Sequence, residues 1–463
     1  MQTRFPSGRR WILGAALAVA GCRSYAPQPL DPQEILLRVA TEREVPLEEE
    51  GVSLARASEL MRAHSPRLQE ARAAYRTSQA VADTKTPLPN PRLDLAPIFT
   101  DVASLGSDSW GGDLALGWTI LLGGKRRLND ELNKIRAERD LIDVGATERD
   151  EFLALRKDLI DLAMATRIEA AAQSLYKTAE RSLTAVRAMV EAADGTALDV
   201  SQFQQELFQA EADLLEGSET RMEARMAVGA RTGVDGSAFP SAVAPRVPAD
   251  LPTKVDLRER MMRDHPELAR LRAEYAVSEK ELEAELAEQY PDLDIGALYE
   301  RDEGDNRYGI GIGIELPIFD RNQLGIARAD ARRNEVRDRF AAQVRRSLAD
   351  IDSAHGVLGI RRRRLAIVRD KLQPAARRTL ELARRALEVG SADGLRLLTV
   401  IQNNRLMRVR VLRNEQQVLD AWSTLELACG SPLLVFPDPQ SEPENQSEPE
   451  IQSEPANQPE EQN

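Results

Sequence analysis

Four short stretches of the chain alternate apolar residues with small or polar ones, which is the pattern of β-strands. The stretches run over about residues 92–99, 111–121, 292–299 and 307–318. In the last of them the apolar positions are Tyr308, Ile310, Ile312, Ile314 and Leu316, and the intervening ones are Gly309, Gly311, Gly313 and Glu315. In the second, the apolar positions are Leu114, Leu116, Trp118 and Ile120.

A strand that is apolar on one side and nearly bare on the other suits the wall of a β-barrel, with lipid or core outside and a wet lumen inside. Four strands cannot close a barrel alone. We therefore expect a barrel shared among subunits, because lipid leaves no room for an open sheet edge. The alternative is two β-hairpins packed on helices in a soluble α+β protein.

Long helices are predicted after each strand pair. From Arg126 to about Val190, and from Asn322 to about Glu388, glycine is scarce and Pro374 is the single proline. Each segment reaches roughly 100 Å if it is helical throughout. The apolar residues step by three and four, as in coiled-coil seams. They are Leu175, Ala179, Leu183, Val186 and Val190 in one segment, and Leu365, Val368 and Leu372 in the other. A shorter helix is predicted over 53–83.

Each long helix is expected to turn back at a glycine and form a helical hairpin. Gly195 and Gly390 can adopt the positive φ that ends a helix, and Thr196 or Ser391 can cap the helix that follows. Two hairpins therefore project from the strand region.

The two halves of the chain repeat one order of elements. Pro91 and Pro291 are 200 residues apart, Ile120 and Ile318 are 198 apart, and Gly233 and Gly430 are 197 apart. Such a duplication makes each half one structural unit. We assign the first repeat to 52–240 and the second to 241–435, in a mainly α protein with a small β part.

The two ends of the chain differ from these repeats. Residues 1–21 read as an export signal, with a basic start and an apolar run too short to span a bilayer. Val19-Ala20-Gly21-Cys22 resembles a bacterial lipobox, which predicts lipidation at Cys22, and Arg23 favours delivery to the outer membrane. The alternative is an ordinary cleavage site beside an incidental cysteine. Residues 22–51 are expected to form an extended tether, and 436–463 a disordered acidic tail.

Composition argues against several classes of protein. The net charge is −13, much of it from the tail, and the rest is close to balanced, which argues against nucleic acid as a partner. The motifs of common enzymes are absent. His64 and His265, each at a turn before a proline, are expected to be structural, and lone His355 to be a surface or packing residue. Cys429 is expected to be buried. We predict neither enzyme activity nor a metal or cofactor.

Together these features resemble the TolC family of outer-membrane efflux channels, and specifically its lipoprotein branch. The resemblance covers roughly residues 52–435. It is carried by paired motifs, by one unpaired motif and by the hairpin turns. The motifs are His64-Ser65-Pro66-Arg67-Leu68 with His265-Pro266-Glu267-Leu268, Asn90-Pro91-Arg92-Leu93 with Tyr290-Pro291-Asp292-Leu293, Leu316-Pro317-Ile318-Phe319-Asp320, and the turns at Gly195 and Gly390.

The resemblance implies a homotrimer in which each subunit gives four strands to one outer-membrane β-barrel and two hairpins to a periplasmic tunnel. An inner-membrane efflux pump would supply the energy. A periplasmic adaptor would dock at the hairpin tips, around Gly195, Thr196, Ala197, Leu198, Gly390, Ser391, Ala392 and Asp393. The second turn departs from the family pattern by its extra Gly394, and the first lacks an aliphatic residue after its glycine.

Charged residues near the tips would then form a gate by pairing between subunits. The candidates are Asp194, Asp199, Asp393, Arg384 and Arg385. The alternative is that these charges belong to solvated helix faces. Two other classes of protein also stay open. They are a periplasmic adaptor, which has one hairpin and more strands, and a coiled-coil scaffold without a channel. The exported substrate is not readable from the sequence.

Overall fold

The computed structural model describes residues 25–44, 52–102, 107–192, 196–302, 305–389 and 394–437. The chain divides into two compact units, Met1–Val45 and Pro46–Asn463. The expected export signal and Cys22 lie outside the described residues, as does the tail from residue 438 onward.

The first unit contains one described helix, α2 (Pro32–Arg43). The Asp31 side chain accepts hydrogen bonds from the backbone N–H groups of Gln33 and Glu34, and Pro32 takes the first helical position. The expectation of an extended tether is therefore wrong over this stretch. A proline in the first turn costs no hydrogen bond and sets φ for a helix, so it starts α2.

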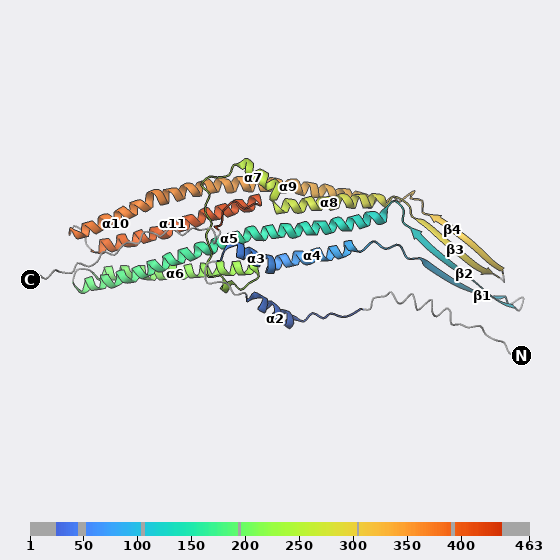
Figure 1. Cartoon of the computed structure of the whole chain (residues 1–463), viewed down its shortest axis with the longest axis horizontal. Coiled ribbons are helices and arrows are strands. Elements are labelled where there is room, and N and C mark those ends of the chain that lie inside the picture. Colours follow the sequence, from blue (N-terminus) through green and yellow to red (C-terminus); the bar gives the residue numbers. More distant parts are fainter. Residues whose placement is uncertain are drawn as a thin grey trace, which may run out of the picture. The chain divides into compact units, whose positions relative to one another are not determined.

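The second unit repeats one order of elements: two helices, two strands, a long helix and its return helix (Figure 1). In the first repeat these are α3 (Leu54–His64), α4 (Pro66–Asp83), β1 (Arg92–Val102), β2 (Ser107–Ile120), α5 (Lys125–Glu191) and α6 (Ala197–Thr232), with the short η1 (Gly236–Ala238). In the second they are α7 (Lys254–Asp264), α8 (Pro266–Ala287), β3 (Leu293–Asp302), β4 (Asp305–Ile314), α9 (Gln323–Ile367), η2 (Val368–Leu372), α10 (Gln373–Glu388) and α11 (Gly394–Cys429).

The helix predicted over 53–83 is two helices, divided at Ser65. Ser65 has φ −55° and ψ 123°, outside the helical region, because the ring of Pro66 disfavours helical geometry in the residue before it. The same break separates α7 from α8, where His265 precedes Pro266. His64 is thus not equivalent to His265. Ser65 occupies the matching position, and His64 is the last residue of α3.

The strands form one four-stranded antiparallel sheet in the order β1-β2-β3-β4. Leu93 pairs with Leu116, Trp118 with Ile295, and Leu293 with Ile314. Four strands were predicted, and the described residues contain four. β4 stops at Ile314, short of the expected residue 318, because β3 begins at Leu293 and offers no partner beyond it. Pro317 also lacks a backbone donor.

Each long helix packs against a return helix, α5 against α6 and α10 against α11, as the two predicted hairpins require. The seam of α5 is confirmed by Leu175, Ala179, Leu183 and Val186, which are all at most 5% exposed. In the second repeat Val368 is buried, but Leu372 is 38% exposed. Gly233 and Gly430 end α6 and α11 with φ of 74° and 68°, values that favour glycine.

The expectation of one unbroken helix from residue 322 to 388 is wrong at η2, a π-helical turn between α9 and α10. The backbone N–H of Gln373 bonds to the carbonyl of Val368, five residues earlier. The next residue, Pro374, has no N–H and its ring crowds the preceding turn. A wider turn accommodates this defect without ending the helix.

The main apolar core lies where the two repeats meet. Ile160 and Met164 of α5 contact a cluster that includes Leu257 of α7, Leu358 of α9 and Trp422 of α11, all nearly or fully buried. α5 of the first repeat also lies along α8 of the second (Figure 1). Cys429 is fully buried, as predicted. Among the described residues, no helix is both long enough and apolar enough to cross a bilayer.

Candidate functional site

The sheet exposes apolar side chains on each of its four strands. On β4, Tyr308, Ile310 and Ile312 are each at least 74% exposed, and every residue of that strand is exposed. Leu93 and Leu95 of β1 and Leu116 and Trp118 of β2 are at least 40% exposed. An added Cβ would meet nothing within 4 Å at Gly311. The predicted alternation of apolar and nearly bare positions is therefore present, and its apolar side is not covered by the described chain.

The two long helices begin with the same backbone device where they leave the sheet. Gly124, before α5, has φ 75°, and Asn322, before α9, has φ 57°. These left-handed residues turn the chain from strand to helix direction. The Asn322 amide also donates to the carbonyl and carboxylate oxygens of Glu285 at 2.9 and 2.6 Å.

A buried lysine fastens the first of these turns to the second repeat. Lys125 Nζ lies 3.0 Å from Asp292 Oδ1 and 3.2 Å from Glu288 Oε2. Asp292 also accepts a hydrogen bond from the backbone N–H of Leu122. The start of α5 is therefore held to the segment that leads into β3.

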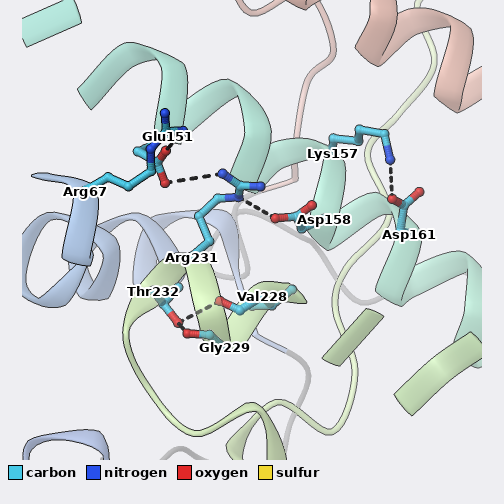
Figure 2. Close-up of polar contacts among 9 residues, drawn as sticks. All are labelled: Arg67, Glu151, Lys157, Asp158, Asp161, Val228, Gly229, Arg231 and Thr232. Carbon is cyan, nitrogen blue, oxygen red and sulfur yellow. Dashed lines mark hydrogen bonds and ion pairs between the residues drawn. The ribbon is translucent and has the colours of Figure 1, made fainter. Parts of the chain in front are cut away.

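A second polar cluster joins the base of the first hairpin, as Figure 2 shows. Glu151 of α5 is 2% exposed and accepts from Arg67 of α4 at 2.9 Å and from Arg231 of α6 at 3.3 Å. Arg231 also lies 2.5 Å from Asp158. Burial alone would lower the pKa of the Arg231 guanidinium, but its two carboxylate partners raise it overall. This cluster fixes α4 and α6 to one level of α5.

A buried ion pair joins α5 of the first repeat to the end of α11 in the second repeat. Arg156 and Glu426, both under 5% exposed, meet at 2.7 Å. Glu426 also accepts from the backbone N–H groups of Leu433 and Leu434 at 2.6 and 2.7 Å, and Arg156 donates to the carbonyl of Leu434. The Arg156 guanidinium lies over the Phe436 ring at 4.8 Å. One side chain from each repeat thus anchors the segment after α11.

Two acidic side chains face each other between α5 and α11. Asp161 is bonded to Lys157 at 2.5 Å, and Asp420 lies beside this pair at the edge of a cavity between α5, α6 and α11. Burial, followed by the charge of Asp161, raises the pKa of Asp420 to about 6. Burial likewise raises the pKa of Asp161. The pair therefore titrates above the usual range of carboxyl groups.

The described part of the first hairpin tip is exposed and well capped. Ala197 and Leu198 face solvent, and Leu198 is 66% exposed. Thr196 and Asp199 form a reciprocal cap, in which the Thr196 backbone N–H donates to Asp199 Oδ2 at 2.8 Å. The predicted cap at Thr196 is confirmed. The carboxylate of Asp199, a candidate gate residue, is occupied by this cap, and hydrogen bonds from Thr196 lower its pKa.

The other predicted tip residues are only partly described. Arg384 and Arg385 are exposed on α10. Asp194, Gly195, Gly390, Ser391, Ala392 and Asp393 lie outside the described residues.

The described part of the chain was predicted to hold no metal, and its histidines and acidic residues can be compared with that prediction. No group of three or more His, Cys, Asp or Glu side chains is placed there to hold a metal ion. His265 caps α8, and its Nδ1 accepts from the backbone N–H of Glu267 at 3.2 Å. Burial lowers the pKa of His265. This is the structural role expected for it.

Sequence reasoning missed the residues that join the repeats. Glu151, Arg156 and Glu426 were not singled out, and only Glu426 stands directly between apolar residues, in Leu425-Glu426-Leu427. A charge at such a position is buried only when it is paired. That signal alone indicates a buried ion pair but does not identify the partner.

The chain matches known proteins over both repeats. Residues 57–234 and 257–431, together 353 of the 463 residues, match the family described as outer membrane efflux protein. The cobalt-zinc-cadmium resistance protein CzcC of Cupriavidus metallidurans is 26% identical over 257 residues, which are 54% of this chain and 61% of CzcC. The alignment thus spans about three fifths of that relative's length.

Solved structures share the fold. The outer-membrane channel OprN superimposes with a TM-score of 0.67 and 17% identity, over 82% of this chain and 90% of OprN. The CmeC outer membrane channel of Campylobacter jejuni gives a TM-score of 0.65 and 15% identity, over 88% of this chain and 93% of CmeC. The mainly helical fold with a small sheet, and the resemblance drawn from the sequence, are confirmed. Two matched segments, one for each repeat, show that the chain belongs to the outer membrane efflux protein family.

Proposed function

We propose that this protein is the outer-membrane channel of a tripartite efflux system and works as a homotrimer. It conducts substrates passively, because an inner-membrane pump supplies the energy. The observation that carries the proposal is the exposed apolar side of a four-stranded sheet whose first and last strands have no outer neighbour among the described residues. Neither the apolar side nor the free edges suit an isolated sheet in water or lipid.

Three copies would resolve both problems. They supply twelve strands, four from each chain, and a closed barrel leaves no unpaired edge. The apolar side would face lipid, and the side bearing Gly309, Gly311 and Gly313 would face the lumen. The helical hairpins would extend the channel into the periplasm. No catalytic step is needed for such passage, so we infer that the protein is not an enzyme.

Lipidation at Cys22 would anchor the chain to the outer membrane, after removal of residues 1–21. This supports localisation but is not required for the barrel.

The hairpin tips are proposed as the docking site of a periplasmic adaptor. The exposed Leu198 offers an apolar contact at a helix start fixed by the Thr196–Asp199 cap. For the gate, we now favour Arg384 and Arg385 over Asp199, since the carboxylate of Asp199 is already used within its own chain. The tip residues outside the described part of the chain remain candidates for adaptor docking and for the gate.

The substrate class follows from the curated relative. CzcC is named for cobalt, zinc and cadmium resistance, so we propose divalent transition metals as the first cargo to test. The described residues hold no metal cluster, and a conduit that binds its cargo weakly needs none.

The test is to purify the full chain from outer membranes in detergent, measure its mass, and record conductance in planar bilayers. We expect a trimeric mass and discrete conductance steps. A monomer without conductance, found in the inner-membrane or periplasmic fraction, would contradict the proposal and favour an adaptor or a scaffold. Deletion of the gene should lower tolerance to cobalt, zinc or cadmium, and unchanged metal tolerance would contradict the proposed cargo.

A further inference from the structure

The internal duplication gives a way to locate contacts between copies of the chain. In the sheet, β1 and β3 are equivalent with an offset of 200 residues, and β2 and β4 with an offset of 198. The strand registers obey these offsets: the pair Leu93–Leu116 becomes Leu293–Ile314, which is also a pair. β2 pairs with β3 where the two repeats meet. Applying the same offsets to this pair gives a pairing of β4 with β1, and within the described chain these two strands are not neighbours.

Among the helices, too, the first repeat has contact partners that the second repeat lacks. α5 of the first repeat packs against α8 and α11 of the second, whereas α9, its equivalent, makes no comparable contact with α4 or α6 within the described chain. Ile351 and Leu358 of α9 are buried at the positions equivalent to Leu153 and Ile160 of α5, so the offset of 198 holds along both helices. α9 thus has a side that matches the contact surface of α5 but lacks its partners.

The free side of α4 is correspondingly open. Ala273 and Val277 of α8 are 6% and 5% exposed, because α8 lies between α5 and α9. Their equivalents on α4, Ala73 and Thr77, are exposed and line an open groove with Val81. The helix face that is buried on α8 is exposed on the equivalent α4, so in a single chain this face of α4 lacks a contact partner.

We infer that a second copy of this chain completes both contacts, with a defined register and a defined charge pair. This rests on the proposed homotrimer and specifies its interface. In the sheet, the offsets convert the pair Trp118–Ile295 into a pair between Leu316 of one copy and Leu95 of the next. They convert the pair Gly117–Gly296 into a pair between Glu315 of one copy and Ala96 of the next.

The alternation of apolar residues along the two strands independently supports the predicted register. Leu95 lies on the apolar side of β1, and Leu316 continues the apolar alternation of β4 beyond its last residue, Ile314. A slip of one residue would place Leu316 opposite Asp94 or Ala96. The predicted register also accounts for the early end of β4. Residues 118–120 of β2 are held as strand by β3 alone, since the pairing of β2 with β1 ends at Gly117. Residues 315 and 316 would be held in the same way by the neighbouring β1.

On the helices, the duplication places a glutamate where the other repeat has an arginine, and an arginine where it has the threonine which that arginine contacts. Arg270 of α8 bonds to Thr147 of α5 and to the flanking Asp143 and Asp150, at 2.6 to 3.1 Å. The position equivalent to Arg270 on α4 is Glu70, and the position equivalent to Thr147 on α9 is Arg345. Both are exposed, and neither enters an ion pair among the described residues. Glu70 of one copy is therefore assigned to Arg345 of the next.

The register is tested by cysteine cross-linking in the full-length protein from outer membranes. Leu95→Cys with Leu316→Cys, and Ala96→Cys with Glu315→Cys, cover the two kinds of antiparallel pair. Oxidation should link chains into a ladder up to trimer on non-reducing gels. Links within one chain are excluded, because β1 and β4 are three strand spacings apart, roughly 14 Å.

The matched control combines Leu316→Cys with Leu93→Cys, two residues out of register on the same side. A diagonal pair is too far apart for a disulfide, so this control should not form the ladder. If the protein is trimeric by mass in reductant but only the control links, the register is wrong and the proposed function stands. A monomeric mass in reductant for the unmodified chain overturns both.

The charge pair is tested by exchange. Glu70→Arg and Arg345→Glu should each make the trimer dissociate roughly fivefold faster in detergent, and the double variant should return close to the original rate. Faster dissociation of the single variants without rescue in the double variant would contradict the pairing. The sheet cross-links report separately whether each charge variant still assembles.

Discussion

Asp420 shows how one carboxyl group can make stability depend on pH. The unfolded group titrates near 3.8 and the folded group near 6, so in between the folded protein binds more protons. Folding stability therefore falls as pH rises from about 4 to about 6, and the penalty stays constant above that range. Asp161, Lys157 and Arg361 are the charged groups that face Asp420. Of these, Asp161 adds to the rise.

We predict that Asp420→Asn stabilises the protein at pH 7.5 by about 1 to 2 kcal/mol, a value reduced from the full shift because the side chain is half-buried. The gain should vanish near pH 4, where the native group is already neutral. Thermal unfolding followed by circular dichroism at both pH values measures this. Asp250→Asn, at an exposed position before α7, is the control, and an equal gain at both pH values would disprove the titration argument.

The Arg156–Glu426 pair illustrates the cost of one unpaired charge. Replacing Arg156 by Met leaves Glu426 buried with only the two backbone donors of Leu433 and Leu434. We predict destabilisation by about 3 to 5 kcal/mol, and a smaller loss when Glu426→Met is combined with it. Unfolding temperatures of the single and double variants decide this. Arg337→Met on the surface of α9 should have little effect.

At the scale of elements, the starts of the long helices depend on backbone conformation. Gly124 has φ 75°, which costs a residue with a Cβ about 1 kcal/mol or more. Gly145 lies inside α5, where an added Cβ meets nothing within 4 Å. We predict that Gly124→Ala destabilises the protein by about 1 kcal/mol and that Gly145→Ala stabilises it by a similar amount. Unfolding curves compare the two, and equal signs would contradict the prediction.

The sequence predicted elements well where the pattern is local and long. The seam of α5, the four strands and the cap at Thr196 each follow from neighbouring residues. The errors arose where one residue changes the backbone: Pro32 starts a helix, Pro66 divides one, and Pro374 is accompanied by a π-helical turn. The ion pairs of Glu151 and Arg156 join residues about 80 and 270 positions apart, and no periodicity reports such contacts.

At the scale of the whole molecule, α6 displays apolar residues at every seventh position. Phe208, Leu215 and Met222 are at least 58% exposed. Leu412 and Leu419, the equivalents of Leu215 and Met222 on α11, are buried against α5 and its neighbours. A regular apolar line of this kind on a water-facing helix indicates a helical partner.

We predict that Leu215→Glu weakens assembly and shifts the mass in detergent from trimer toward monomer. A buried carboxylate without a partner would cost several kcal/mol at each of the three contacts. Light scattering after size exclusion measures the shift. Gln209→Glu adds the same charge about 120° away around α6 and should leave the mass unchanged. Loss of helical circular dichroism in Leu215→Glu would indicate misfolding instead.

The packing of α5 against α8 and α11 has a kinetic consequence. Because the two repeats are covalently joined, this contact closes at an effective concentration set by the connecting chain, whatever the number of molecules present. The equivalent contact of α9 would need a collision between chains, and its rate would rise with protein concentration. The contacts between the two repeats of one chain therefore form without a second molecule. Dilution should slow only the formation of the contacts between chains.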